Sequence, residues 1–155
     1  MRHKLKGNRL SRNTGHRLSM LKNLSKDLIL YESVVTTLAR AKELKRYAEK
    51  IITRGKEDTV HNRRQIISKL GQSDAYKKLF EDVGLRYKDR EGGYTRIIRV
   101  PSSNTKSKFK SFYRKGDGAE LAKVELVNES TVSNQESKLE PAENITDSNT
   151  NGSSK

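Results

Sequence analysis

The chain has 155 residues, with 33 Lys and Arg against 19 Asp and Glu, a formal net charge of +14, and no cysteine. Without cysteine there are no disulfides and no thiolate metal ligands, and the longest apolar runs are far too short for a membrane-spanning helix. Apolar residues make up only 32% of the chain, so the core is small, and the excess of positive charge favours a polyanionic partner because neutralised phosphates release condensed counterions.

The charge is distributed unevenly along the chain. Residues 1–26 hold eight Lys and Arg and no acidic residue, whereas residues 129–155 hold five acidic residues and two lysines. Removing this net charge of −3 from the +14 of the whole chain leaves +17 for residues 1–128. The acidic segment is polar and has no apolar period, so it cannot bury enough surface to offset ordering entropy. We therefore expect a folded domain over 1–128, including a basic arm at 1–13, and a disordered acidic tail over 129–155.

The first part of the domain has a helical period. Leucines at three- and four-residue spacing predict a helix over 14–31, and the β-branched run at 34–36 predicts a short strand. Thr37 is then expected to cap a second helix that runs to about Thr53, with Gly55 following its end.

Two shorter helices are predicted after the second one. Apolar residues at helical spacing favour helices at about 58–70 and 74–83, and Gly71 and Gly84 are expected to end them.

The remainder changes to a two-residue period. Residues 94–100 are rich in strand formers, and residues 122–127 alternate apolar with charged side chains. Residues 112–114 and the glycine turn at 116–118 are predicted to form a hairpin with the last strand. The fold class is therefore α+β, with several helices packed on a small mixed β-sheet.

No constellation for catalysis is present in the sequence. His3, His16 and His61 are far apart, and none has the spacing of a metal ligand. The chain also lacks a phosphate-binding loop and a nucleophile elbow. We expect neither enzymatic activity nor a metal or cofactor.

The basic residues of the arm and the helices are the candidates for binding nucleic acid. The arm lacks a core-forming pattern and could thread along a phosphate groove, although a solubilising tail is the alternative. Its positive charge continues into the first two helices, which favours binding. The candidates in this part are Arg2, His3, Lys4, Lys6, Arg9, Arg12, His16, Arg17, Lys22, Asn23, Arg40, Lys42, Lys45 and Arg46.

Two further motifs could contact RNA. Asn62-Arg63-Arg64 opens a helix, where arginines can grip phosphate or simply form a solvated face. Arg90, followed by Gly92-Gly93-Tyr94-Thr95-Arg96, combines glycines that permit close backbone approach with groups that stack, hydrogen-bond and clamp phosphate. The alternative is a glycine turn into a strand whose Tyr94 packs in the core.

An ordered set of residues over about 1–128 resembles family seventeen of the bacterial-type large-subunit ribosomal proteins. The resemblance is carried by Met1-Arg2-His3, Leu10, Arg12, His16-Arg17, Met20, Asn23-Leu24, Glu32, Thr36-Thr37, Arg40-Ala41-Lys42-Glu43-Leu44, Ile52-Thr53, Asn62-Arg63-Arg64, Arg90, Gly92-Gly93-Tyr94-Thr95-Arg96-Ile97, Gly116-Asp117, Ala119 and Glu125-Leu126-Val127.

The resemblance implies a cytoplasmic, ribosome-associated structural protein. Members of this family bind large-subunit ribosomal RNA near the rim of the peptide exit tunnel and contact the small large-subunit protein numbered thirty-two. The loop at 101–111 is longer and more polar than in the minimal family version, and the tail after Asn128 looks like an extension whose role does not carry over.

Two other classes of protein compete with this interpretation. A DNA-binding architectural or regulatory protein would need a helix-turn-helix register, a zipper or an apolar wedge, and an RNA-modifying enzyme would need a cofactor loop or catalytic cluster. None of these features stands out. Basic residues spread over arm, helices and strands suit wrapping by folded RNA better than insertion into one groove.

Overall fold

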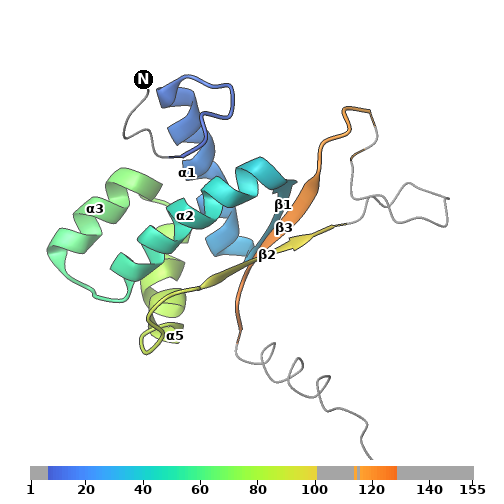
Figure 1. Cartoon of the computed structure of the whole chain (residues 1–155). Helices are drawn as coiled ribbons and strands as arrows, with labels where there is room; N and C mark the ends of the chain where they lie inside the picture. The colour runs from blue at the N-terminus through green and yellow to red at the C-terminus, as the bar shows by residue number, and fades with distance from the viewer. Residues whose placement is uncertain (1–6, 101–113, 115, 129–155) are drawn as a thin grey trace, which may run out of the picture.

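The computed structural model describes residues 7–100, 114 and 116–128 (Figure 1). The predicted tail at 129–155, the loop at 102–111 and residues 112–113 of the predicted hairpin lie outside these residues. Within the described part, helices pack on a small sheet, which confirms the α+β class.

The first helix, α1, spans Thr14–Tyr31, as its leucine spacing predicted. Its inner face buries Leu21, Ser25, Leu28 and Ile29, and the Ser25 hydroxyl is satisfied by donating to the Leu21 carbonyl at 2.7 Å. A left-handed residue, Glu32 with φ of 59°, ends α1.

Strand β1 covers Ser33–Thr37, and helix α2 follows over Leu38–Gly55. Thr37 stands at the N-cap position, as predicted, but its side chain makes no capping hydrogen bond. The Leu38 N–H instead donates to the Glu120 carbonyl at 2.9 Å, which ties the start of α2 to the sheet.

Helix α3 spans Val60–Leu70 and is capped by Thr59, whose hydroxyl accepts from the Asn62 N–H. Gly71, with φ of +76°, ends α3 as predicted. The next helical stretch consists of α4 (Asp74–Lys78), a π-helical turn η1 (Leu79–Val83) and α5 (Gly84–Arg86).

The predictions for Gly55 and Gly84 were wrong. Gly55 is the last residue of α2 rather than a residue beyond it, and Gly84 has helical dihedrals, with φ of −63° and ψ of −40°. A Cβ on Gly84 would lie 2.4 Å from the Gly55 carbonyl oxygen, and a Cβ on Gly55 would lie 2.9 Å from Cγ of Leu79. Glycine is therefore needed at both positions because two helical segments pack closely there, and not because a helix ends there.

Strands β2 (Thr95–Arg99) and β3 (Leu121–Leu126) complete a three-stranded sheet in the order β1-β3-β2. Both pairings are antiparallel, so the expected mixed sheet was wrong in this detail. The helices return the chain so that β1 and β2 run the same way, but β3 lies between them and opposes both. The prediction that 112–114 would pair with the last strand lies largely outside the described residues; Arg114 and Ala119 are joined across the turn by a backbone hydrogen bond.

The core lies between one face of the sheet and the helices. Figure 1 shows α2 running between the sheet and α3. Its buried residues are Ala41, Leu44, Ala48, Ile51, Ile52 and Gly55. The largest fully buried side chains are Tyr94, Leu28, Ile29, Leu44, Ile51, Ile52, Ile66, Leu70, Leu79, Val83 and Val124.

Candidate nucleic-acid interface

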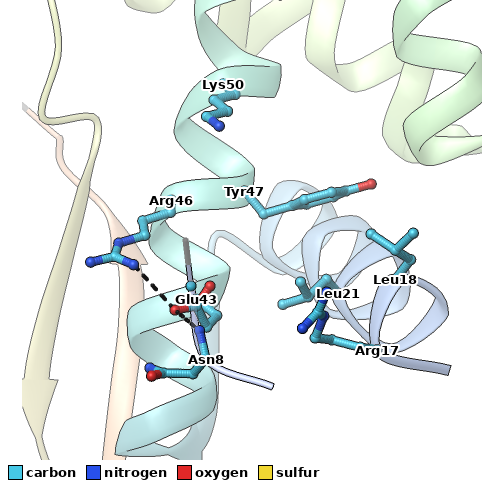
Figure 2. Close-up of a pocket in the computed structure, with 9 residues that line it drawn as sticks. Asn8, Arg17, Leu18, Leu21, Glu43, Arg46, Tyr47 and Lys50 are labelled. Atoms are coloured by element: carbon cyan, nitrogen blue, oxygen red, sulfur yellow. Dashed lines mark hydrogen bonds and ion pairs between the residues drawn. The ribbon is translucent and has the colours of Figure 1, made fainter. Parts of the chain in front are cut away.

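The described part of the basic arm is anchored to α2 by a carboxylate. The Asn8 N–H donates to Oε1 of Glu43 at 3.0 Å, and the same oxygen accepts from Nη1 of Arg46 at 3.3 Å. Figure 2 shows Glu43 between Asn8 and Arg46. A single acidic side chain on α2 therefore holds the arm against a surface that is otherwise cationic.

A tight turn then leads from the arm into α1. The Arg12 N–H donates to the Arg9 carbonyl at 3.2 Å, and the two residues between them, Leu10 and Ser11, both have positive φ. Arg12 stays beside α1, where its Nη1 lies 3.5 Å from Nε2 of the exposed His16. The remaining arm candidates, Arg2, His3, Lys4 and Lys6, lie outside the described residues, and their contact with RNA stays a prediction.

A groove of about 290 Å³ lies between the arm, α1 and α2. Figure 2 shows side chains of α1 facing Tyr47 of α2 across it, with Lys50 one turn further along α2. Arg17, Arg46 and Lys50 give the groove a positive character, and Glu43 is its only acidic lining residue among those described. The apolar floor comes from Leu18 and Leu21. The lining residues are Gly7, Asn8, Arg17, Leu18, Leu21, Glu43, Arg46, Tyr47 and Lys50.

The other cations of α2 point away from the core, as their spacing predicted. Lys45 lies 3.8 Å from Glu49, a long and partly exposed pair that contributes little stability. Within the described residues, Arg40 and Lys42 form no ion pair, and Lys42 is exposed.

On α1, Lys22 lies against the end of α3, because a Cβ on Gly71 would come within 3.3 Å of its Nζ. An ammonium at this place is stabilised by the negative C-terminal end of the α3 dipole. Asn23, one residue on, is exposed.

Two residues of the Asn62-Arg63-Arg64 motif form hydrogen bonds at the start of α3. The Asn62 side chain donates to the Glu57 carbonyl at 3.1 Å, and both Nε and Nη2 of Arg63 donate to the Asp58 carboxylate. These bonds raise the pKa of Arg63 and lower that of Asp58. Arg64 is exposed and has no ion pair within the described chain, so it is the member of the motif whose charge is available.

The glycine motif at 90–96 is built into the fold. The Tyr94 ring is 1% exposed and packs on Tyr87 at 5.2 Å between ring centroids. The Thr95 hydroxyl donates to Glu49 at 3.1 Å, and Arg96 donates to Glu125 at 2.7 Å. Stacking of bases on Tyr94 does not fit this arrangement, because the ring fills the core.

The glycines themselves form the turn that precedes β2. Gly93 has φ of +64°, and the Arg90 Nε donates to the Gly92 carbonyl at 3.1 Å. No neighbouring atom among the described residues lies within 4 Å of a Cβ placed on Gly92 or Gly93. Approach of RNA to their backbone stays a prediction.

Comparison with known proteins decides the identity of this basic α+β chain. A sequence model described as Ribosomal protein L17 matches residues 20–127. The chain belongs to the ribosomal protein L17 family.

Relatives of this L17 family member are titled "Large ribosomal subunit protein bL17". The one from Magnetococcus marinus is 46% identical over 134 residues, covering 86% of this chain and 98% of that protein. The one from Ehrlichia ruminantium strain Gardel is 45% identical, with the same two coverages. The one from Salinibacter ruber is 46% identical over 132 residues, but the chain spans only 61% of its length.

The described part of this L17 chain has neither a metal site nor a membrane-spanning helix. No group of three or more His, Asp or Glu residues there could hold a metal ion. Helices long and apolar enough to cross a bilayer are also missing from the described ranges.

Sequence reasoning missed a cationic cluster in this L17 fold. Lys50 and Arg54 lie on the side of α2 whose Tyr47 hydroxyl donates to the Lys69 carbonyl of α3 at 3.1 Å. Burial, and then the charges of Arg54 and Lys50, lower the pKa of Lys69. The four-residue spacing of Lys50 and Arg54 places these two residues on one side of α2 and could have been read from the sequence. Nothing in the sequence pairs Lys69 with them, because it belongs to another helix.

Proposed function

We propose that this chain is a structural constituent of the large ribosomal subunit, where it binds large-subunit ribosomal RNA and supports subunit assembly and translation. The match to the L17 family over residues 20–127 carries the proposal. The proposal includes no enzymatic role and no cofactor, and in it the protein is associated with ribosomes in the cytoplasm.

The charge distribution supports RNA as the partner. Residues 1–128 carry +17, and the anchored arm, the groove with Arg17 and Lys50, and the available Arg64 present that charge over several elements. A surface spread in this way suits folded RNA, which offers phosphates from several directions.

The finer expectations of the family are proposed with it. The domain over 1–128 binds RNA and the tail at 129–155 adds little to that binding. The binding place is the rim of the peptide exit tunnel, beside the small large-subunit protein numbered thirty-two.

Co-sedimentation with ribosomal subunits tests the proposal directly. The full chain should stay with the large subunit, and not the small one, through a high-salt wash. With isolated ribosomal RNA, neutralising about six to ten phosphates should lower the affinity by about 10³–10⁵-fold between 50 and 200 mM salt. Equal retention on both subunits, or a flat salt response, would contradict the proposal. Equal affinity for duplex DNA would favour the DNA-binding alternative.

A further inference from the structure

Three cations, Lys50, Arg54 and Lys69, lie at the seam between α2 and α3, and Lys50 among them also lines the groove that anchors the arm. Tyr47, Lys50 and Arg54 follow one another at three- and four-residue spacing, so they share one side of α2. The Tyr47 hydroxyl donates to the Lys69 carbonyl at 3.1 Å. This bond fixes the last turn of α3, and with it Lys69, beside the side of α2 that carries Lys50 and Arg54.

The cluster has no counter-charge in the described part of the chain. None of Lys50, Arg54 and Lys69 forms an ion pair there, although acids elsewhere pair with many of the cations. Nη1 of Arg54 is buried and has no hydrogen-bond partner among the described residues. Buried donors in native proteins are almost always bonded, so this orphaned nitrogen marks a guanidinium that the described fold does not neutralise.

The dipole of α3 explains part of this arrangement but not all of it. Cations are favoured at a helix C-terminus, which accounts for Lys69 and for Lys22 beside Gly71. Arg54 lies in the last turn of α2, whose own dipole favours a cation there, but neither helix brings a counter-charge to the cluster. Neighbouring like charges repel, and an anion bound between them would offset that repulsion.

We propose that Lys50, Arg54 and Lys69 form a site for one phosphodiester group of large-subunit ribosomal RNA. Arg54 supplies a planar guanidinium that can donate two hydrogen bonds to one phosphate, and the lysines supply point charges from two helices. The site rests on the proposed function for the source of the phosphate. It also extends the binding surface from the groove between α1 and α2 to the end of α3.

Inorganic phosphate tests the site without RNA. The pKa of Lys69 is followed in the full chain by NMR of its ε-methylene group, in phosphate and in chloride at equal ionic strength. Burial and the charges of Arg54 and Lys50 lower this pKa in the free protein. Saturable binding of phosphate should raise it, and Arg54→Gln should abolish the response while leaving the fold intact. An identical pKa of Lys69 in phosphate and chloride would overturn the proposal.

Ribosomal RNA tests the same site in its proposed setting. Lys69→Gln and Arg54→Gln should each reduce the slope of log affinity against log salt. The double variant should reduce it by about 0.7–0.9, the equivalent of one phosphate. Lys77→Gln is the matched control, because Lys77 is exposed and already lies 3.8 Å from Asp74. Arg54→Lys should recover the slope but not the full affinity, since it keeps the charge and loses the fork.

The outcomes separate this proposal from the proposed function. If the wild-type chain binds RNA with the expected salt dependence and the cluster variants keep its slope, the cluster is not a phosphate site. If the wild-type chain fails to bind RNA, the proposed function fails, and the phosphate titration decides the site on its own. A lowered pKa of Lys69 after deletion of residues 129–155 would assign the cluster to the acidic tail and overturn the proposal.

Discussion

Glu32 joins three helical segments through its carboxylate. It accepts from Nη1 and Nη2 of Arg86 at 3.1 and 2.9 Å, and it lies 3.1 Å from Nζ of Lys78. Its own carbonyl accepts from the Leu126 N–H at 2.9 Å. The side chain is 29% exposed, so water screens these ion pairs only in part. Glu32→Gln should therefore weaken the junction of α1 with α4 and α5, whereas the backbone bond to the sheet remains.

The size of the effect follows from the pKa of Glu32. The hydrogen bond from Arg86 is the main cause that lowers this pKa from 4.5 to about 2, with Lys78 adding to it against the opposing effect of burial. A shift of this size corresponds to an upper limit of roughly 3.4 kcal/mol. Solvent screening reduces it, and Arg86 keeps Asp82 as a second partner. We expect Glu32→Gln to lower the free energy of unfolding at pH 7 by about 1–2 kcal/mol.

The stabilising effect of Glu32 should decrease as the pH falls. Because the pKa is lower in the folded than in the unfolded chain, the carboxylate stabilises the fold at neutral pH. That contribution is lost as pH falls from about 5 towards 2.

Urea unfolding followed by circular dichroism, between pH 7 and pH 3, measures the difference between wild type and Glu32→Gln. By pH 3 less than about half of the neutral-pH difference should remain. Asp58→Asn is the control, because Asp58 also pairs with an arginine but at an exposed position. A difference for Glu32→Gln that is the same at pH 3 and pH 7 would refute the electrostatic explanation.

Three further predictions concern packing, the arm and the glycine motif. Gly84→Ala should lower the free energy of unfolding by about 1–3 kcal/mol, because the added Cβ would lie 2.4 Å from a backbone oxygen. Gly15→Ala is the control: its Cβ would meet no atom within 4 Å, so the free energy of unfolding should stay equal or rise by up to about 1 kcal/mol. Equal urea midpoints for the two variants would contradict the packing argument. Glu43→Gln should speed amide hydrogen exchange at Asn8 with little loss of global stability, and unchanged protection would show that the carboxylate does not hold the arm. Arg96→Lys should cost about 1 kcal/mol or less in stability and leave RNA affinity unchanged, since its guanidinium is committed to a carboxylate on β3; weaker RNA binding by the folded variant would restore this arginine as a contact.

The elements of the fold could be predicted where one local signal dominated. The leucine spacing of α1 gave its bounds, because no proline interrupts it, its single glycine, Gly15, lies in the first turn, and Leu21 and Leu28 share its buried face. Gly84 shows the limit of such signals. A glycine ends a helix in one context and admits a neighbouring backbone in another, and only the position of Gly55 in space decides between them.

The candidate site was harder to predict than the fold, for a similar reason. Residues 90–96 contain the types that bind RNA, but Tyr94 is needed to fill the core and Arg96 to neutralise Glu125. Conversely, the cluster with Lys69 depends on contact between two helices, which no spacing along the chain encodes.

The acidic residues of the domain sort its cations into two groups. Arg63, Arg86 and Arg96 each face a carboxylate from another turn or element, and each helps to hold the fold together. The cations of the groove and of the α2–α3 seam largely lack such partners in the described chain. A folded domain gains no stability from unpaired like charges that lie close together, and a partner that brings negative charge accounts for them. Glu43 is an acidic residue among the cations of the groove. Its carboxylate accepts from the Asn8 N–H of the arm and so holds the positively charged arm on the same surface.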